Sequence, residues 1–375
     1  MAAETYPHVR VHGSPRERGR QYGQLTRSRV RRSVEAYAGV FRRWADLDWG
    51  EVRTLAEAYV PAIEAHEPRY LEELGGIAEG AGLDFRDVLA INVRTEVMFS
   101  AKARAAEALG RVPGECTSLV VLPSASAAGH TLAAQNWDWL AHARETVVVL
   151  EVEQDEGPHF VTLVEAGLLA KFGMNAAGVG VLTNTLVCEH DRGEPSIPYH
   201  VVLRSLLDAT SITDALSRLQ AITRASSANY LLAHRDGLAV DVEAMAGDFA
   251  RLLIEQPRDG LLAHTNHYLS PRFPARDVGL WVMPDSLFRL QSTLEYLRPR
   301  LGRLEPESIQ RALSLHANHP EGVCTHPDES LDAGEQGATV VSAIMDLDDR
   351  LMWIADGNPC TTGYRLVDYS AFLGR

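Results

Sequence analysis

Cysteine is scarce in this chain, and no two of its cysteines are close in the sequence. The four are Cys116, Cys188, Cys324 and Cys360, and none of them forms a CxxC pair. Disulfide frameworks and sequence-encoded zinc sites both need cysteines at short, regular spacings. We therefore expect neither a disulfide framework nor a metal site, and we expect the cysteines other than Cys116 to be buried free thiols.

The chain also lacks long apolar runs, internal repeats and low-complexity linkers. No apolar stretch reaches the roughly 18 to 20 residues that cross a bilayer, and residues 1–13 lack the basic and then apolar layout of a secretory signal. These absences predict a cytoplasmic protein without a membrane partner. Apolar residues still make up 46% of the 375 residues, which is enough to fill a substantial core.

An excess of positive charge is missing too. The formal net charge is −14, and because residues 1–115 carry equal numbers of acidic and basic side chains, the whole acidic surplus lies in residues 116–375. An acidic body repels phosphate backbones, so we expect no nucleic-acid partner. The ten arginines between Arg10 and Arg43 are interpreted as a solvated helix face.

The sequence pattern changes from helical to β-rich near residue 115. Residues 14–106 are helical in pattern, starting with Ser14 as N-cap, Pro15 at the first helical position and Glu17 at the third. Short β-rich runs follow the boundary, and later segments return to helices and hairpins. The predicted strands are 117–122, 131–136, 146–153 and 159–165, the helical segments 199–222, 285–297 and 305–317, and the hairpins 230–243 and 339–356. This order predicts a layered body of strands and helix pairs, with a helical N-terminal segment packed on it.

The most informative feature is a cysteine at the head of a predicted strand. Cys116 follows Glu115 and opens the first β-rich run, and Asp138 stands on the next run, far enough along for a turn to bring the two side by side. This arrangement fits a nucleophile that becomes a new N-terminus when the preceding peptide bond breaks. The alternative for Asp138 is a structural aspartate at a strand end.

Self-cleavage between Glu115 and Cys116 would let one residue supply both the nucleophile and the base. The thiol attacks the Glu115 carbonyl, the amide becomes a thioester, and water hydrolyses it. The freed α-amine has a pKa of about 7.7–8.0, against roughly 10.4 for lysine, so it can act as the base. If Asp138 abuts that amine, its charge orients the group and favours the ammonium form.

Several short stretches resemble segments of one family in the same order along the chain. They are 14–19, 114–118, 135–138, 171–179, 226–230, 264–267 and 324–328. They are similar to the self-processing acyltransferases and amidohydrolases typified by isopenicillin N acyltransferase. The resemblance implies an α+β N-terminal-nucleophile fold, a four-layer αββα sandwich of two antiparallel sheets between helical layers.

The resemblance also implies that self-cleavage divides the chain into two parts with different roles. Residues 1–115 become a helical α chain that stays bound to the catalytic β chain, residues 116–375. The enzyme acts on a small N-acyl compound and needs no cofactor, with acyl-coenzyme A open as a co-substrate. Two departures from the family stand out: Glu115 replaces a glycine, which predicts slow self-cleavage, and Thr325 replaces an arginine.

By resemblance, Asn229 supplies the oxyanion hydrogen bond, with a turn-capping asparagine as the alternative. Asn175 and Asn184 are second choices for that donor. Further residues are expected to line or support the pocket, namely Asn136, Trp137, Asn175, His264, Asn266 and His267.

His264 and His267 also admit other interpretations. Their HxxH spacing suggests a metal site or a cysteine-protease base, but an extended segment would point the two rings to opposite faces, and no third ligand is evident nearby. Two other functions stay open beside the self-processing enzyme. One is an unprocessed intracellular cysteine peptidase, and the other is a non-catalytic binding protein with the same fold.

Overall fold

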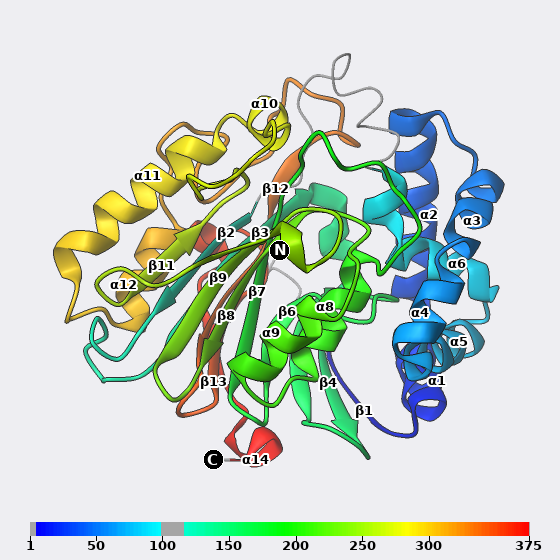
Figure 1. The fold of residues 1–375 in the computed structure, drawn as a ribbon, viewed down its shortest axis with the longest axis horizontal. Coiled ribbons are helices and arrows are strands. Elements are labelled where there is room, and N and C mark those ends of the chain that lie inside the picture. The colour runs from blue at the N-terminus through cyan, green and yellow to red at the C-terminus, as the bar shows by residue number, and fades with distance from the viewer. Residues whose placement is uncertain (1–4, 99–115, 375) are drawn as a thin grey trace.

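The protein is described by a computed structural model that covers residues 5–98 and 116–374. Two β-sheets lie face to face, with helices on their outer faces (Figure 1). In order of pairing, the larger sheet contains β1 (His8–Gly13), β4 (Val147–Gln154), β5 (Phe160–Glu165), β6 (Phe172–Asn175), β7 (Val179–Thr185), β8 (Ala228–His234), β9 (Leu238–Ala244) and β10 (Leu252–Glu255). The smaller contains β11 (Leu261–His264), β2 (Cys116–Val121), β3 (Leu132–Leu140), β12 (Gly337–Asp346), β13 (Leu351–Ala355) and β14 (Arg365–Asp368).

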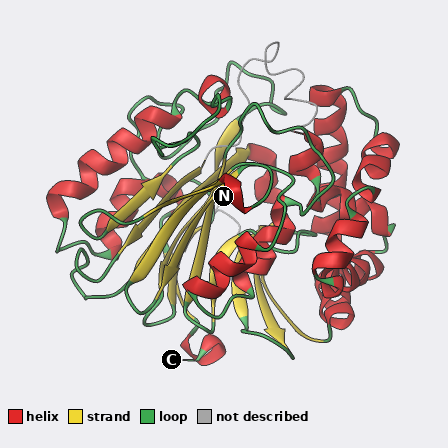
Figure 2. Ribbon diagram, in the orientation of Figure 1, coloured by secondary structure: helices red, strands yellow, loops and turns green. Residues whose placement is uncertain are grey.

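The helices fall into two groups on opposite sides of the sheets (Figure 2). The N-terminal group is α1 (Pro15–Leu25), α2 (Arg27–Ala45), α3 (Trp49–Glu57), α4 (Val60–His66), α5 (Pro68–Ala81) and α6 (Phe85–Asn92), joined by α8 (Tyr199–Leu207) and α9 (Ile212–Gln220). The other group centres on α11 (Ser286–Leu297) and α12 (Pro306–Leu313). Short helices complete the described chain, namely α10 (Gly279–Val282), α13 (Pro359–Thr362) and α14 (Ser370–Leu373).

Three apolar clusters fill the spaces between four layers. Side chains alternate between the two faces of a strand, and on β4 Val148 and Leu150 pack towards the N-terminal helices while Val149 packs towards the smaller sheet. On β2, Val120 faces the larger sheet and Leu119 faces α11 and α12. The αββα sandwich implied by the resemblance is therefore confirmed.

The N-terminal segment is mainly helical, and it adds a strand that the pattern analysis did not anticipate. Ser14 and Glu17 form the expected capping box at α1. Just before it, β1 pairs in parallel with β4 at the edge of the larger sheet. Val9 and Val11 are buried while Arg10 between them is exposed, so a period of two was present in the sequence. Residues 99–106 of the predicted helical region lie outside the described residues.

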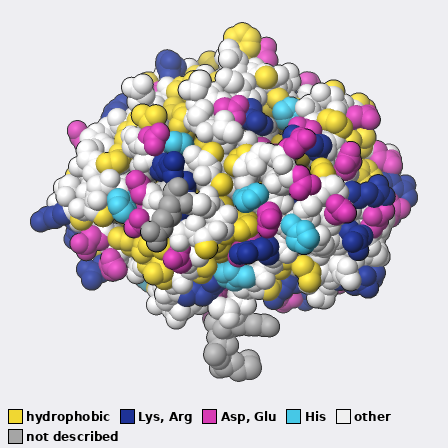
Figure 3. Space-filling model, turned by 90° about the horizontal axis from the view of Figure 1, so that it is seen from below, with side chains coloured by type: hydrophobic (Ala, Val, Ile, Leu, Met, Phe, Trp, Pro, Cys, Tyr) yellow, Lys and Arg dark blue, Asp and Glu magenta, His cyan; other side chains and the backbone are white. Residues whose placement is uncertain are grey.

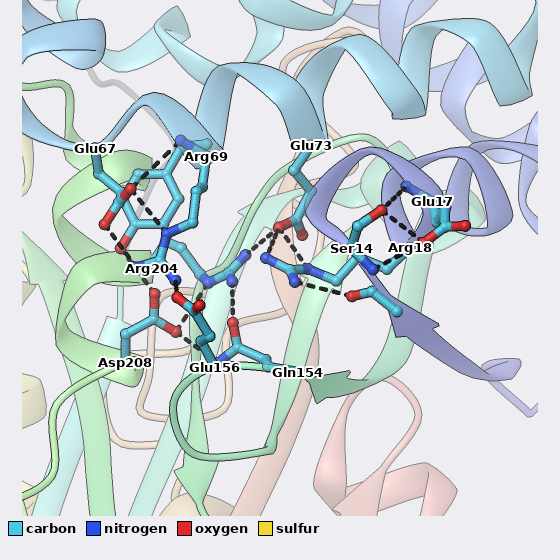
Figure 4. Close-up of polar contacts among 12 residues, drawn as sticks. Ser14, Glu17, Arg18, Glu67, Arg69, Glu73, Gln154, Glu156, Arg204 and Asp208 are labelled. Atoms are coloured by element: carbon cyan, nitrogen blue, oxygen red, sulfur yellow. Dashed lines mark hydrogen bonds and ion pairs between the residues drawn. The ribbon is translucent and has the colours of Figure 1, made fainter.

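A buried ionic network fastens this segment to the body of the protein (Figure 4). Glu73 on α5 accepts hydrogen bonds from Arg18 on α1 (2.9 Å) and from Arg204 on α8 (2.8 Å). Arg204 also donates to Gln154 at the end of β4 (2.6 Å) and pairs with Asp208 (3.3 Å). Arg18, Glu73 and Arg204 are all almost fully buried. Elements from both sides of residue 115 are thus held by one set of charges.

Most of the ten arginines between Arg10 and Arg43 are exposed, as expected of a solvated helix face, and several of them also bind main-chain carbonyls. Arg27 donates to the main-chain oxygen of Gly80 (3.0 Å), and Arg31 donates to that of Gly82 (2.7 Å). Arg29 donates to the main-chain oxygen of Glu145 (2.6 Å). These guanidinium groups satisfy carbonyls at the end of α5 and at the turn before β4, because a long side chain can reach a neighbouring element while its head stays near water.

Charge is mixed on the molecular surface. Figure 3 shows acidic and basic side chains interspersed with apolar ones on the face seen from below. In the part of the chain that the structure describes, no helix combines the length and the apolar character needed to cross a bilayer.

Candidate active site

Cys116 opens β2 and is almost fully buried. It lies directly opposite Trp137 in the antiparallel pairing of β2 and β3. Residues opposite each other in such a pair point to the same face, and both side chains belong to the apolar cluster between the two sheets. Pairing with β12 extends β3 to Leu140, so Asp138 lies within the strand rather than after it.

A small cavity lies beside Cys116. Its volume is about 20 Å³, enough for about one water molecule. The lining residues among the described ranges come from both sides of the predicted cleavage point, and they are Arg94, Thr95, Met98, Cys116, Trp137, Asp138, Trp139, Lys171, Thr185 and Tyr199. The segment before residue 115 therefore lines the same cavity as the segment after it.

The main chain of Cys116 is held on both sides. Its N–H donates to Oδ1 of Asn266 (2.7 Å), and its carbonyl oxygen accepts from Nδ2 of Asn184 (3.0 Å) and Nη1 of Arg289 (2.9 Å). Arg289 also donates to Asn266 (3.0 Å) and is anchored by Asp285 (2.6 Å). The nitrogen that self-cleavage would free thus already faces an amide oxygen.

Asp138 approaches the Cys116 sulfur with its main chain. Its backbone N–H is directed at the thiol, and its Oδ1 accepts from the Thr339 hydroxyl (2.5 Å). Burial raises the pKa of Asp138 to about 7, although Arg289 and Thr339 act in the opposite direction. Its Oδ2 has no hydrogen-bond partner within the described ranges. A contact between Asp138 and the freed α-amine stays a prediction, because in the uncut chain Asn266 occupies the position next to that nitrogen.

Lys171 is a feature of this site that the sequence analysis missed. It precedes β6 and is buried, with Nζ 4.4 Å from the centre of the Trp137 ring and 5.9 Å from that of Tyr199. Burial lowers the pKa of Lys171 to about 8, and the nearby Cys116 opposes that shift. Burial likewise raises the pKa of Cys116 to about 11, with Lys171 opposing it. At neutral pH the cavity therefore pairs a thiol with an ammonium group.

The amino-acid composition already indicated that Lys171 is unusual. The chain has 36 basic side chains, of which only Lys102 and Lys171 are lysines. Arginine stays charged in proteins, whereas a buried lysine can lose its proton near neutral pH. A rare lysine in an arginine-rich chain was therefore a candidate for proton transfer. Arg289 had no comparable signal, because 173 residues separate it from Cys116.

Asn229 is linked to Cys116 through one intervening side chain, that of Asn184. Its Nδ2 donates to Oδ1 of Asn184 (3.4 Å), and Asn184 in turn binds the Cys116 carbonyl oxygen. Both amides are fully buried on adjacent strands, β7 and β8. Asn184, a second choice in the sequence analysis, thus contacts Cys116 directly, as Asn266 does.

Asn136 and Asn175 hold the scaffold instead of facing the cavity. Asn136 donates to the main-chain oxygens of Leu313 and Val323 (2.8 and 2.7 Å), which fastens the chain after α12. Asn175 donates to that of Leu207 (2.8 Å) and ties β6 to the end of α8. Glu115, the other residue of the predicted cleavage point, lies outside the described residues.

His264 and His267 have partners other than Cys116. His264 contacts the main-chain oxygen of the next residue through Nδ1 (2.7 Å) and Glu243 through Nε2 (2.9 Å). Burial lowers its pKa, but Asp241 and Glu243 outweigh burial and raise it. The Nδ1 of His267 lies 2.7 Å from the Ser286 hydroxyl, and burial lowers the pKa of His267 to about 4. Both nitrogens of His264 are engaged by partners other than Cys116, and Nδ1 of His267 faces Ser286, so none of these contacts forms the Cys–His pair of a cysteine peptidase.

The remaining cysteines divide into two environments. Cys188 is buried in contact with the Ser227 hydroxyl (3.5 Å), as expected of a free thiol. Cys324 is buried but lies 3.5 Å from Cys360, and the expectation that Cys360 is buried is wrong, because it lies on α13 at the surface. Among the described residues, two clusters bring together groups that hold metals, and neither includes the HxxH pair.

Comparison with known proteins identifies relatives over most of the chain. The family model described as acyl-coenzyme A:6-aminopenicillanic acid acyl-transferase matches residues 126–361, a range that begins after Cys116. The 40 kDa form of acyl-coenzyme A:6-aminopenicillanic-acid-acyltransferase from Emericella nidulans is 24% identical over 352 residues. That alignment covers 94% of this chain and 93% of the relative.

Two solved structures align with about two thirds of the chain. A mutant of conjugated bile acid hydrolase from Clostridium perfringens has a TM-score of 0.44 and 10% identity, over 68% of this chain and 93% of that one. Penicillin V acylase from Agrobacterium tumefaciens has a TM-score of 0.42 and 16% identity, over 68% of this chain and 86% of that one.

Proposed function

Because the chain belongs to the acyl-coenzyme A:6-aminopenicillanic acid acyl-transferase family, we propose that it is a self-processing acyltransferase or amidohydrolase with Cys116 as nucleophile. The observation that carries this proposal is the cavity where a strand-opening cysteine, a buried carboxyl group and a buried lysine meet. Its substrate is a small N-acyl compound, and the acyl group passes through a thioester on Cys116. The protein needs no cofactor.

Self-cleavage is the first step of the proposed mechanism. The Cys116 sulfur attacks the carbonyl carbon of Glu115, the C–N bond breaks, and the nitrogen takes up a proton. Water then hydrolyses the thioester, which releases the Glu115 carboxylate and restores the thiol. The charge and bulk of Glu115 slow this step relative to a glycine at the same position.

The thiol needs a base before the α-amine exists. Lys171 meets this need, because its pKa of about 8 leaves a neutral fraction near pH 7 and its charge acts directly on Cys116. Asp138 is a further titratable group at the cavity, with a pKa of about 7. The buried lysine therefore supports self-cleavage as well as later turnover.

After cleavage, the new α-amine serves as base while Asn266 orients it through Oδ1. The thiolate attacks the acyl carbon of the substrate, the amine leaves with a proton, and water or an acceptor amine resolves the thioester. An acyl-coenzyme A thioester can load the same cysteine. Amide donors at Asn184 and Asn229 supply the oxyanion hydrogen bond once the substrate displaces their present partners, and such a donor is worth about 3 kcal/mol.

The test is the intact mass of purified protein. Wild type is expected to yield two fragments, residues 1–115 and 116–375, that co-purify. Cys116→Ala is expected to stay whole, and Cys188→Ala, which changes a buried thiol elsewhere, is expected to split like wild type. Cleaved protein should also hydrolyse or transfer the acyl group of small acyl amides.

Two outcomes would contradict the proposal. One is wild-type protein that hydrolyses acyl amides while it remains a single uncut chain. The other is a Cys116→Ala variant that keeps wild-type activity.

A further inference from the structure

Four metal-ligating side chains converge at a place distinct from the cavity beside Cys116. His316 follows α12, Cys324 and His326 lie in the loop before β12, and Cys360 lies on α13. Their ligand atoms all lie within 4.8 Å of one another. The Sγ atoms of the two cysteines are 3.5 Å apart, and the Nε2 atoms of the two histidines are 3.2 Å apart. His326 Nε2 lies 3.3 Å from Cys360 Sγ and 3.6 Å from Cys324 Sγ.

These separations are those of ligands around a single tetrahedral ion. Zinc bonds of about 2.3 Å to sulfur and about 2.0–2.1 Å to nitrogen place ligand atoms about 3.8 Å apart for S···S, about 3.5 Å for S···N and about 3.3 Å for N···N. Each of the four distances above agrees with these values to within about 0.3 Å. We propose that His316, Cys324, His326 and Cys360 form a structural Zn²⁺ site.

A disulfide explains the arrangement less well. A disulfide holds its sulfurs at about 2.05 Å, whereas these lie 3.5 Å apart. A disulfide would also not explain why the two imidazole nitrogens lie so close to each other, or why His326 lies so close to both sulfurs. A cation at the centre gives all four groups a role, and the Cys₂His₂ set is a common structural zinc set.

The loop before β12 is shaped to present its ligands. The helix predicted over 305–317 ends at Leu313, and the chain then folds back on itself. The N–H of Cys324 donates to the main-chain oxygen of Leu315 (3.0 Å), and that of His326 donates to the oxygen of Pro320 (2.8 Å). These bonds bring residues on either side of the turn together, so His316 meets Cys324 and His326.

The Asn358 side chain also holds one of the cysteine ligands in place. Asn358, next to α13, donates from Nδ2 to Cys324 Sγ (3.2 Å) and to the main-chain oxygen of Thr325 (2.7 Å). Hydrogen bonds of this kind orient metal ligands and tune them. His316 and Cys360 are exposed, which gives an ion a path from solvent.

The cluster is linked to the support of Asp138. Thr325, between the two loop ligands, donates from its N–H to the Thr339 hydroxyl (2.9 Å). Thr339 in turn donates to Asp138 (2.5 Å). An ion that fixes Cys324 and His326 therefore also fixes the residue between them, so the zinc site stabilises the scaffold around Asp138 without touching the reacting atoms.

The experiment measures metal in the full-length protein, purified without a histidine tag and under reducing conditions. We expect one zinc per chain by plasma mass spectrometry after dialysis against metal-free buffer. Cys324→Ser, Cys360→Ser and His326→Ala should each lose at least about nine-tenths of it. Cys188→Ser and His319→Ala, a thiol and a neighbouring imidazole outside the set, should keep it.

Cobalt gives a readout of geometry that does not depend on activity or self-cleavage. Co²⁺ in place of zinc should produce thiolate charge-transfer bands and intense tetrahedral d–d bands, both weakened in Cys360→Ser. The proposal is overturned if the reduced protein retains no zinc after incubation with Zn²⁺. It is equally overturned if the ligand variants keep full zinc, or if the native chain is short by two hydrogen atoms through a Cys324–Cys360 disulfide.

Discussion

Lys171 is a residue whose chemistry the fold changes markedly. An exposed lysine keeps its proton up to a pH of about 10.4. Burial beside Trp137 lowers the pKa of Lys171 to about 8, so its neutral fraction grows between about pH 7 and 9. A group that gains neutral form in this range can take the thiol proton of Cys116, whose own pKa burial raises to about 11. The pH dependence of self-cleavage should therefore report on Lys171.

Lys171→Met should slow self-cleavage by about 10²–10⁴-fold, the usual contribution of a positioned acid or base. In wild type the rate should rise as pH increases through about 8 and then level off, and this limb should vanish in the variant. The measurement is the fraction of cleaved chain against time by denaturing electrophoresis at pH 6 to 10.

Lys171→Arg is the matched control, because it keeps the positive charge but cannot release a proton in this range. It should be nearly as slow as Lys171→Met if proton transfer matters. A Lys171→Met chain that cleaves at the wild-type rate with the wild-type pH profile would rule out this role.

At the scale of elements, α1 and α5 cross with their backbones in close contact. A Cβ added at Gly76 on α5 would lie 2.2 Å from the main-chain oxygen of Arg16, and one added at Gly23 on α1 would lie 2.1 Å from that of Ile77. Real Cβ atoms do not approach backbone so closely, so the helices would have to move apart. Glycine is required here for space, which fixes how the N-terminal helices stack.

Gly76→Ala should destabilise the protein by about 1–3 kcal/mol, the usual cost of overpacking. Gly75→Ala on the same helix is the matched control, because its added Cβ meets no atom within 4 Å. That control should be neutral or more stable by up to about 1 kcal/mol, since alanine favours helix. Urea denaturation of both glycine variants, each made in the Cys116→Ala background, gives their free energies of unfolding. Equal changes for Gly76→Ala and Gly75→Ala would contradict the packing argument.

At the scale of the whole molecule, residues on both sides of the predicted cleavage point are interlocked. Parallel pairing of β1 with β4, the ionic network around Glu73 and the shared cavity beside Cys116 all join them. A cut at residue 115 therefore leaves the two chains with a large common interface. This explains how a nicked protein can keep its active site.

Glu73→Gln should weaken that interface strongly. It removes the carboxylate that the buried Arg18 and Arg204 share. Arg204 keeps Asp208, but one positive charge in the network is left uncompensated, and breaking a buried pair in this way costs about 3–5 kcal/mol. Glu79→Gln is the matched control, because the Arg16–Glu79 pair is exposed and screening by water leaves it little effect on stability. Urea denaturation of the uncut Cys116→Ala forms gives the two free energies of unfolding, and similar losses for both variants would refute a central role for the network.

Local patterns in the sequence determined much of the fold. The capping box at Ser14, the period-two runs and the position of Cys116 at a strand head each depend on residues a few places apart. The same patterns brought Asp138 near the sulfur, because a strand, a turn and a returning strand have little freedom of length. Their interactions are short in sequence, so their geometry follows from backbone periodicity.

Only the tertiary structure decided which distant side chains surround that cysteine. Asn266 reaches its nitrogen across 150 residues, and Lys171 arrives by the packing of one sheet on the other. Cys360 joins His326 from a separate helix in the same way. Such meetings depend on how whole layers pack, which no spacing along the chain encodes. The sequence by itself thus specified the position of the proposed nucleophile and the layers, while the packing of those layers specified the groups that surround it.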